Sequence, residues 1–414
     1  MTKGYKKEIL RLKKKLVYLL IMVILASVFV CPTFAQVEVD DGYDYTRFKD
    51  AEVVLNVFNW GEYIADGSDD SLDAIKEFEE LTGIDVNYTL FETNESLYTK
   101  LKSGAANYDV IIPSDYMIGK LINEDMLLKL DMDNIPNISK IGKEYQSLSY
   151  DPNNEYSVPY SWGTVGIIYN TTMVDEVVDS WEIMWNEKYK GEILMFNNSR
   201  DAFAIALKKE GLSLNPSTQE ELDIAKEALI EQKPLVQAYV MDEVFDKMIG
   251  GEAAIAPYYA GDAITMIADN PDLAFAIPKE GTNYFVDALC VPKDSQNKEA
   301  AEMFINFMCE TQVALATTEY IGYSSPQVES IELLSDEMKN SPISYPSAEV
   351  LATTETFNVL PDEMNKAMDE AWSQVKSSSE TGNSWILPIV LIFAILVVVF
   401  MYVRKKMKRD RSQY

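Results

Sequence analysis

Apolar strand-like segments alternate with helix-like segments in this chain, and this alternation limits the possible folds more than any other feature. Val53–Phe58 is mostly apolar and β-branched, which is typical of a buried strand. Strands of similar character are expected at Ile84–Leu90 and Tyr108–Ile112, with amphipathic helices between and after them. Residues 68–70 are N-cap types and are expected to begin the first helix. This order predicts an α/β fold with a mostly parallel sheet and right-handed crossovers.

The alternation resumes further along and predicts a second α/β unit. The chain has 414 residues, 47% of them hydrophobic, which is enough for two or three compact units. Helical patterns cover residues 202–209, 217–231 and 243–250, and the chain is expected to be helical again from about 292 to 376. The expected strands are Val165–Tyr169, Gly191–Phe196, Leu235–Val240, Ala253–Ala256, Leu273–Ile277 and Phe285–Val291.

The amino-terminal residues carry the pattern of an export signal. A basic segment over residues 3–15 precedes the apolar run Leu16–Cys31, and Ala35 suits the last position before cleavage. Residues 1–35 are therefore interpreted as a signal peptide, with an uncleaved signal anchor as the alternative. The acidic residues 36–50 show little periodicity and are expected to form a spacer.

The carboxyl-terminal residues predict a membrane anchor. Residues 385–403 contain no charge and are long enough to span a bilayer as a transmembrane helix. The basic tail over residues 404–414 places the C-terminus in the cytoplasm. Residues 377–384 read as a short polar linker. The body between the two ends is therefore expected to lie outside the cytoplasm.

The composition excludes several classes of function. The chain has 36 Lys and Arg residues against 66 Asp and Glu, and the two basic ends leave the body between them still more acidic. Such a body repels nucleic acid and attracts cations. Histidine is absent, which removes Ser-His-Asp triads and the commonest zinc sites. Paired carboxylates leave a glycosidase as an enzyme alternative. Cys290 and Cys309 are expected to be buried free thiols, with a disulfide as the alternative.

No phosphate-binding, dinucleotide-binding, CxxC or EF-hand motif is present, so no cofactor and no metal are expected. Instead, aromatic and acidic residues recur where the expected strands end, which is where α/β sheets bind ligands. Aromatic faces attract an organic cation, and carboxylates pair with its N–H groups. A single aromatic residue here would more often be packing, but the combination recurs in both halves. The groups are Trp60, Glu62 and Tyr63; Ser114 and Tyr116; Asn198 and Asp201; Tyr259 and Asp262; and Phe285 and Asp287.

Four motifs make a specific resemblance. They are Phe-Asn-Trp-Gly-Glu-Tyr (58–63), Tyr-Asp-Val-Ile-Ile-Pro-Ser (108–114), Val-Pro-Tyr-Ser-Trp-Gly (158–163) and Ile-Gly-Tyr (321–323). Together they resemble the family of bacterial spermidine/putrescine-binding proteins, the substrate-capture components of ABC importers. The resemblance extends from about Val53 to Lys376.

The resemblance implies a two-lobed periplasmic-binding-protein fold of type II, which closes on a polyamine without chemistry. The first lobe would cover residues 51–160 and the second residues 161–285, and residues 286–376 would return to the first lobe and end in helices. The implied partners are an ABC permease and its ATPase. The residues implied to bind the ligand are Trp60, Glu62, Tyr63, Ser114, Tyr116, Asn198, Asp201, Tyr259, Asp262, Phe285, Asp287 and Tyr323.

Several positions depart from the spermidine-type pattern of that family. Asn198 replaces a usual carboxylate, Tyr259 and Phe285 replace tryptophans, and Phe357 stands where a polar contact is usual. The run Tyr-Ala-Gly-Asp (259–262) and the sequence Phe-Val-Asp (285–287) instead resemble the putrescine-preferring branch. These departures favour putrescine or a mixed preference. Another small cationic or polar solute, an extracytoplasmic enzyme and a sensory surface protein remain as alternatives.

Overall fold

The computed structural model describes residues 37–378 except residue 105. The predicted signal (1–35), membrane helix (385–403) and basic tail (404–414) lie outside the described residues, as does most of the linker. Within residues 37–378, none of the helices has the length and apolar character needed to cross a bilayer.

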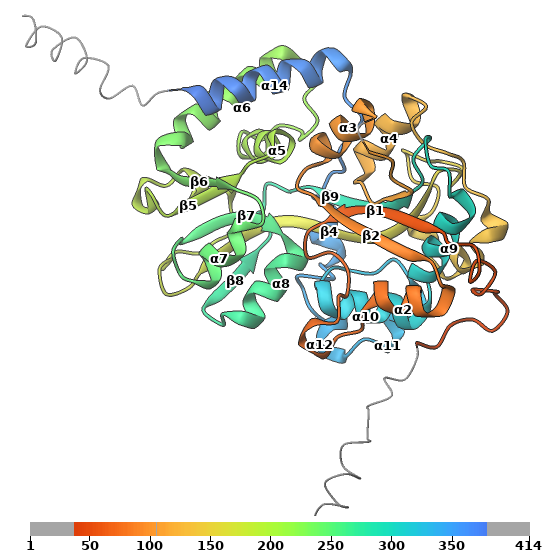
Figure 1. Ribbon diagram of the computed structural model, residues 1–414. Coiled ribbons are helices and arrows are strands. Elements are labelled where there is room, and N and C mark those ends of the chain that lie inside the picture. Colours follow the sequence, from red (N-terminus) through yellow and green to blue (C-terminus); the bar gives the residue numbers. More distant parts are fainter. Residues whose placement is uncertain (1–36, 105, 379–414) are drawn as a thin grey trace, which may run out of the picture.

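A nine-stranded sheet runs through the molecule (Figure 1) in the order β2-β1-β3-β9-β4-β7-β5-β6, with β8 also paired to β4. The pairs of β1 with β2 and β3, and of β5 with β6 and β7, are parallel, as predicted. The sheet as a whole is mixed rather than mostly parallel, because β9 pairs antiparallel with β3, and β4 pairs antiparallel with β7, β8 and β9. The strands are β1 (Val54–Trp60), β2 (Asp85–Phe91), β3 (Val110–Ile111), β4 (Ser157–Asn170), β5 (Ile193–Phe196), β6 (Val236–Val240), β7 (Ile255–Tyr259), β8 (Leu273–Ala276) and β9 (Tyr284–Cys290).

The helices group around two halves of this sheet, which form two lobes (Figure 1). Helices of the first lobe are α2 (Ala74–Thr82), α3 (Asn94–Ser103), α4 (Asp115–Asn123), α9 (Lys298–Met308), α10 (Thr311–Ile321) and α11 (Val328–Leu333), followed by the short α12 (Asp336–Lys339) and α13 (Ala348–Leu351). Helices of the second lobe are α5 (Ser199–Lys209), α6 (Gln219–Gln232), α7 (Glu243–Ile249) and α8 (Ala260–Asp269).

The chain crosses between the lobes three times. The first half of β4 pairs with β9 in the first lobe, and its second half pairs with β7 and β8 in the second lobe. After α13 the chain passes alongside β9, where Glu355 bridges to Asn283. It ends in α14 (Asp362–Ser377), which lies against α6 and α5 of the second lobe. The Lys233 ammonium fixes the end of α14 by donating to the carbonyls of Val375, Lys376 and Ser378.

Two helix starts differ from the sequence prediction. Residues 68–70 form a separate 3₁₀ turn instead of capping the first helix. The helix α2 begins only at Ala74, because the Asp73 side chain accepts the Lys76 N–H at 3.0 Å and so acts as the N-cap. The helix α4 begins at Asp115, three residues earlier than expected, with Ser114 in the N-cap position. Cys290 and Cys309 are buried free thiols, as expected.

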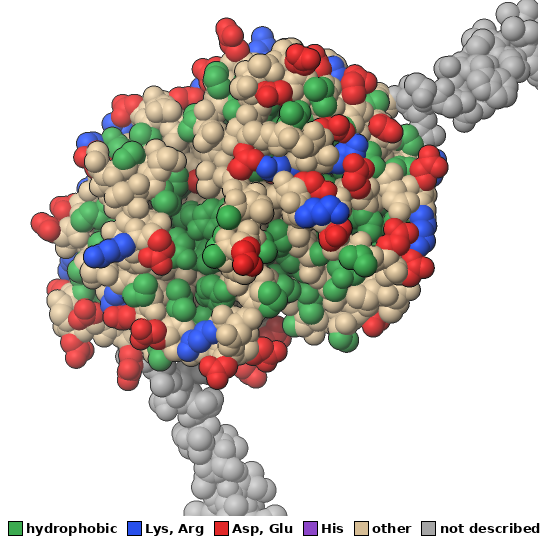
Figure 2. Space-filling model, turned by 180° about the vertical axis from the view of Figure 1, so that it is seen from behind, with side chains coloured by type: hydrophobic (Ala, Val, Ile, Leu, Met, Phe, Trp, Pro, Cys, Tyr) green, Lys and Arg blue, Asp and Glu red, His purple; other side chains and the backbone are tan. Residues whose placement is uncertain are grey.

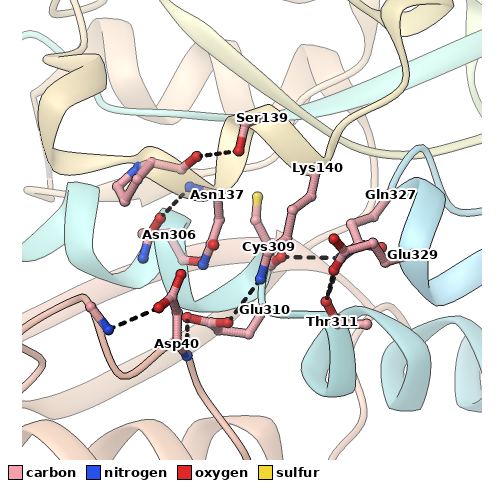
Figure 3. Close-up of polar contacts among 12 residues, drawn as sticks. Asp40, Asn137, Ser139, Lys140, Asn306, Cys309, Glu310, Thr311, Gln327 and Glu329 are labelled. Atoms are coloured by element: carbon pink, nitrogen blue, oxygen red, sulfur yellow. Dashed lines mark hydrogen bonds and ion pairs between the residues drawn. The ribbon is translucent and has the colours of Figure 1, made fainter.

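The acidic segment that was predicted as a spacer packs against the first lobe. Within it, Tyr45 is buried and donates to Glu310 at 2.6 Å, and the Asp40 N–H also reaches this carboxylate. Lys140 pairs with Glu310 at 3.2 Å from the opposite side (Figure 3). Glu310 itself is 2% exposed, and its charge is satisfied by partners from two distant segments of the chain, residues 40–45 and Lys140.

We expect Glu310→Ala to lower the free energy of unfolding by roughly 3 kcal/mol, because the Lys140 ammonium and the Tyr45 hydroxyl would lose their buried acceptor. Urea unfolding followed by circular dichroism measures the change. Glu319→Ala, an exposed position on the helix α10 that follows Glu310, is the matched control and should leave the midpoint unchanged. Equal effects of the two substitutions would show that Glu310 does not hold the acidic segment against the first lobe.

Candidate functional site

A cleft of about 670 Å³ lies between the lobes, beside the crossing strands β4 and β9. Its walls come from both lobes and from the segment that follows α10. Eleven of the twelve residues predicted from the sequence line this cleft: Trp60, Tyr63, Ser114, Tyr116, Asn198, Asp201, Tyr259, Asp262, Phe285, Asp287 and Tyr323. The fold therefore brings together side chains that are separated by more than 200 positions in the chain.

Glu62 is the predicted site residue that does not line the cleft. It lies in a neighbouring groove, which it shares with Asp262 and the exposed Asp69 and Asp70. The backbone explains the placement, because Glu62 has a φ of +49°, in the left-handed region, and the chain turns immediately after β1. Asp262 lines both spaces and thus connects the cleft with this acidic groove.

Each of four carboxylates in the cleft accepts a hydrogen bond from a tyrosine hydroxyl. Tyrosine is well suited to this role because its ring packs against apolar neighbours while its hydroxyl reaches the acid. One pair, Tyr323 with Asp262, joins the first lobe to the second. The pairs are Tyr63 with Asp287 (2.7 Å), Tyr259 with Asp201 (2.9 Å), Tyr323 with Asp262 (2.9 Å) and Tyr116 with Glu95 (2.8 Å).

Asp287 occupies the centre of this arrangement. It lies on β9, is 4% exposed, and forms an isolated bridge with Ser114, the residue before α4. Tyr63 donates to its Oδ2 atom, whereas Oδ1 is buried and has no hydrogen-bond partner among the described residues. A buried carboxylate oxygen without a donor is costly, so this atom is ready to accept an N–H from a ligand.

Asp201 is held by the start of α5. The Asn198 side chain caps this helix, accepting the Asp201 N–H at 2.8 Å through Oδ1. The same side chain donates through Nδ2 to the Asp201 carboxylate at 2.7 Å. Asn198 therefore lines the cleft, but its amide is already engaged in positioning Asp201.

Aromatic rings form the apolar part of the cleft wall. Phe285 packs edge-on against Tyr259 and Tyr323, with ring centroids 5.6 and 6.2 Å apart, and Tyr63 packs against Tyr323 at 4.9 Å. The Trp60 indole is fixed by its N–H, which donates to the Ile112 carbonyl at 2.8 Å. Such rings can cover a methylene chain and attract a cationic nitrogen by their π-faces.

The electrostatics of the cleft favour a cation. Six acidic side chains line it, and among the described residues that form its walls there is no lysine or arginine. Burial raises the pKa of Asp287 to about 6, and burial likewise raises the pKa of Glu95, Asp201 and Asp262. Figure 2 shows the acidic character of the surface on the rear face, where red side chains outnumber blue ones and apolar side chains gather near the middle.

Sequence reasoning missed several lining residues. Glu92 and Glu95 follow β2, and Asp242 follows β6, so the strand-end argument would have found them had it been applied to those two strands. Asn283 precedes β9 and carried no comparable signal. In the described part of the chain, no group of three or more acidic or cysteine side chains is arranged to hold a metal ion.

The fold and the cleft define a two-lobed solute-binding protein. Residues 73–346 match the family of bacterial extracellular solute-binding proteins, and the chain belongs to this family. This membership confirms the predicted class, a binding protein rather than an enzyme, and agrees with an extracytoplasmic location.

Relatives with known names narrow the class further. The chain is 34% identical over 312 residues to a spermidine/putrescine-binding periplasmic protein of Salmonella typhimurium, covering 74% of this chain and 87% of that protein. It is 31% identical to a putrescine-binding periplasmic protein of Pseudomonas aeruginosa, covering 78% and 92%. These similarities confirm the family that the four motifs predicted.

A solved structure from Listeria monocytogenes, a putative spermidine/putrescine ABC transporter, superimposes with a TM-score of 0.75 at 34% identity. The match covers 78% of this chain and 99% of that one, and it confirms the two-lobed periplasmic-binding-protein fold. The part of this chain that the structure describes thus corresponds to nearly the whole of that solved structure.

The raised pKa values predict an unusual pH dependence of stability. A carboxyl whose pKa is higher in the folded than in the unfolded protein contributes stability at low pH, and this contribution is lost as the pH rises through the folded value. For Asp287 that loss occurs between the ordinary value of 3.8 and about 6. The ligand-free protein should therefore melt at a higher temperature at about pH 5 than at about pH 7.5.

Differential scanning calorimetry of residues 37–378 at a series of pH values tests this expectation. Asp287→Asn should flatten the dependence, because an amide does not titrate in this range. A ligand-free protein that is more stable at the higher pH would contradict the raised pKa values of the cleft.

Proposed function

We propose that this protein binds a polyamine, putrescine or spermidine, outside the cytoplasm and delivers it to the permease of an ABC importer that is driven by a cytoplasmic ATPase. The observation that carries the proposal is the cleft itself, in which buried carboxylates and aromatic rings from both lobes converge with no described basic side chain in its walls. Polyamines combine ammonium groups with methylene chains, and this wall offers a partner for each. The names of the relatives support the same ligand class.

The proposed mechanism is capture by lobe closure. Burying an ammonium group is costly unless it is paired, so a ligand would be held only where carboxylates from both lobes reach it. The cation adds contacts to the closed form that the open form lacks, and it thereby shifts the equilibrium toward closure. In this scheme Asp287 pairs with one ammonium group near the crossing strands, and Asp201 and Asp262 serve the parts of the cleft that the second lobe provides.

The remaining predicted residues receive supporting roles. Trp60, Tyr63, Tyr116, Tyr259 and Phe285 would cover the methylene chain, and Ser114 and Tyr323 would orient the carboxylates they contact. Asn198 would act through Asp201. Glu62 would attract cations toward the cleft from the neighbouring acidic groove, since both border Asp262.

The ends of the chain complete the proposal. Residues 385–403 would anchor the protein in the membrane beside its permease, after export directed by residues 1–35. Such a tether is useful where no outer membrane confines a secreted binding protein, which favours a Gram-positive host. The described chain ends on the second lobe, where α14 is fixed by Lys233, so the anchor would hold that lobe.

Isothermal titration calorimetry of residues 37–378 tests the ligand class. We expect saturable one-to-one binding of putrescine, spermidine or both, because the cleft pairs several carboxylates with aromatic rings. Spermine and cadaverine complete the series and define the spacing that the cleft prefers. A cooperatively folded protein that gives no heat with any of these amines would overturn the proposed function.

Asp287→Asn should abolish high-affinity binding while the fold persists, because the carboxylate that pairs with an ammonium group of the ligand would be replaced by a neutral amide. The matched control is Asp115→Asn. Asp115 is also buried and close to Asp287, but it does not line the cleft, and burial raises its pKa to about 8, so it is mostly neutral already. Comparable affinities of the two variants, with unchanged circular dichroism, would contradict the role of Asp287.

Removal of residues 379–414 should release the protein from the membrane fraction of an expressing cell, because the apolar segment 385–403 is the proposed anchor. Removal of residues 404–414 alone is the control and should leave the protein membrane-bound. Full-length protein that alkaline carbonate strips from membranes would contradict the anchor.

A further inference from the structure

One face of the strand β9 presents three different side chains to the cleft in a row. Asn283, Phe285 and Asp287 lie at alternate positions, and all three line the cleft. Asn283 immediately precedes the strand and continues its extended course, since its carbonyl accepts the Val165 N–H at 3.1 Å and it bridges to Glu355 on the other side. Alternate residues of an extended chain point to the same side, so this face carries an amide, a ring and a carboxylate in sequence.

The Asn283 side chain is unusual among the polar groups of the cleft. The residue is 5% exposed, and its Oδ1 atom is buried without a hydrogen-bond partner among the described residues. Among the described residues that line the cleft, only this atom and Asp287 Oδ1 are side-chain oxygens that are buried without a hydrogen-bond partner. Native proteins rarely leave such acceptors unused, so an N–H donor that enters the cleft is the simplest partner for it.

The position of Asn283 locates that donor. Val165 on β4 lies between Asn283 and Tyr259. Its N–H donates to the Asn283 carbonyl on one side, and it pairs with Tyr259 of β7 on the other. Tyr259 in turn donates to Asp201. Asn283 therefore lies toward the Asp201 end of the cleft. Asn198, the other amide of this end, is already engaged with Asp201 through both of its polar atoms. Asn283 is the amide that remains available.

We propose that Asn283 accepts a hydrogen bond from a ligand nitrogen and that, together with Asp287, it selects polyamines by length. Four residues of extended chain separate the two positions by about 13 Å. A four-carbon diamine is too short to reach both comfortably, whereas a triamine in an extended conformation is long enough. The proposal rests on the polyamine-binding function argued above and assigns to Asn283 the part of the ligand that a diamine lacks.

Calorimetric titrations of Asn283→Leu with spermidine and putrescine test the proposal. We expect the spermidine affinity to fall roughly tenfold, as for a lost hydrogen bond to a charged group, and the putrescine affinity to change less than threefold. Asn283→Asp, which offers a charged acceptor of the same shape, should bind spermidine more tightly than the native protein at neutral pH.

Thr164→Val is the matched control. Thr164 pairs with Tyr284 on the neighbouring strand, and its hydroxyl is also buried and unpaired, but it does not line the cleft. Neither Thr164→Val nor Asn283→Leu should lower the melting temperature, because each removes a buried polar atom that has no partner. A purely structural role of Asn283 would instead appear as a lower melting temperature of Asn283→Leu with unchanged binding.

The outcomes separate this proposal from the function on which it rests. A native protein that binds no polyamine would overturn both. A native protein that binds spermidine, with an Asn283→Leu variant of the same affinity, would overturn the role of Asn283 alone. Equal losses for spermidine and putrescine would overturn the selection by length.

Discussion

The burial of acidic charge between two lobes is the constraint on which the rest of the structure depends. Asp287, Asp201 and Asp262 lie where water is largely excluded, and tyrosine hydroxyls and the Asn198 amide hydrogen-bond to them. A hydroxyl satisfies one lone pair but supplies no positive charge, so the ionised forms remain costly and the pKa values rise. A diffusible cation removes this cost, and the lobes can then close without protonating their own walls.

The crossing strands connect the buried carboxylates of the cleft to both lobes. Asp287 lies on β9, which pairs with β4 in the first lobe, and the same β4 continues into the second lobe. The start of β4 is rigid, because the Asp151 carboxylate accepts the N–H groups of Glu155, Tyr156 and Ser157. In the proposed closure, Asp287 would stay with the first lobe, and the carboxylates of the second lobe would approach it.

The sequence predicts the parts of this arrangement that have a local cause. Apolar runs located the strands, the chemistry of strand ends located Trp60 and Asp262 in the cleft, and the alternation of side chains along a strand located Asp287 beside Phe285. Backbone detail was not predicted by the same reasoning. Nothing in the sequence indicates the left-handed φ of Glu62, which directs this residue into the neighbouring groove. The packing of Tyr45 on Glu310 also escaped it, because the two residues are 265 positions apart and the surrounding segment has no periodicity.

Asn198 shows why the departure of one residue from a family pattern can be interpreted only in the folded chain. Read as a lost carboxylate, it suggests a cleft with one fewer partner for an amine. In the structure its amide caps α5 and holds the carboxylate of Asp201, which is a helical turn away. An aspartate at this position could also cap the helix but would repel Asp201 at close range. The amide at position 198 therefore removes one charge from this end of the cleft and fixes the position of the charge that remains, the carboxylate of Asp201.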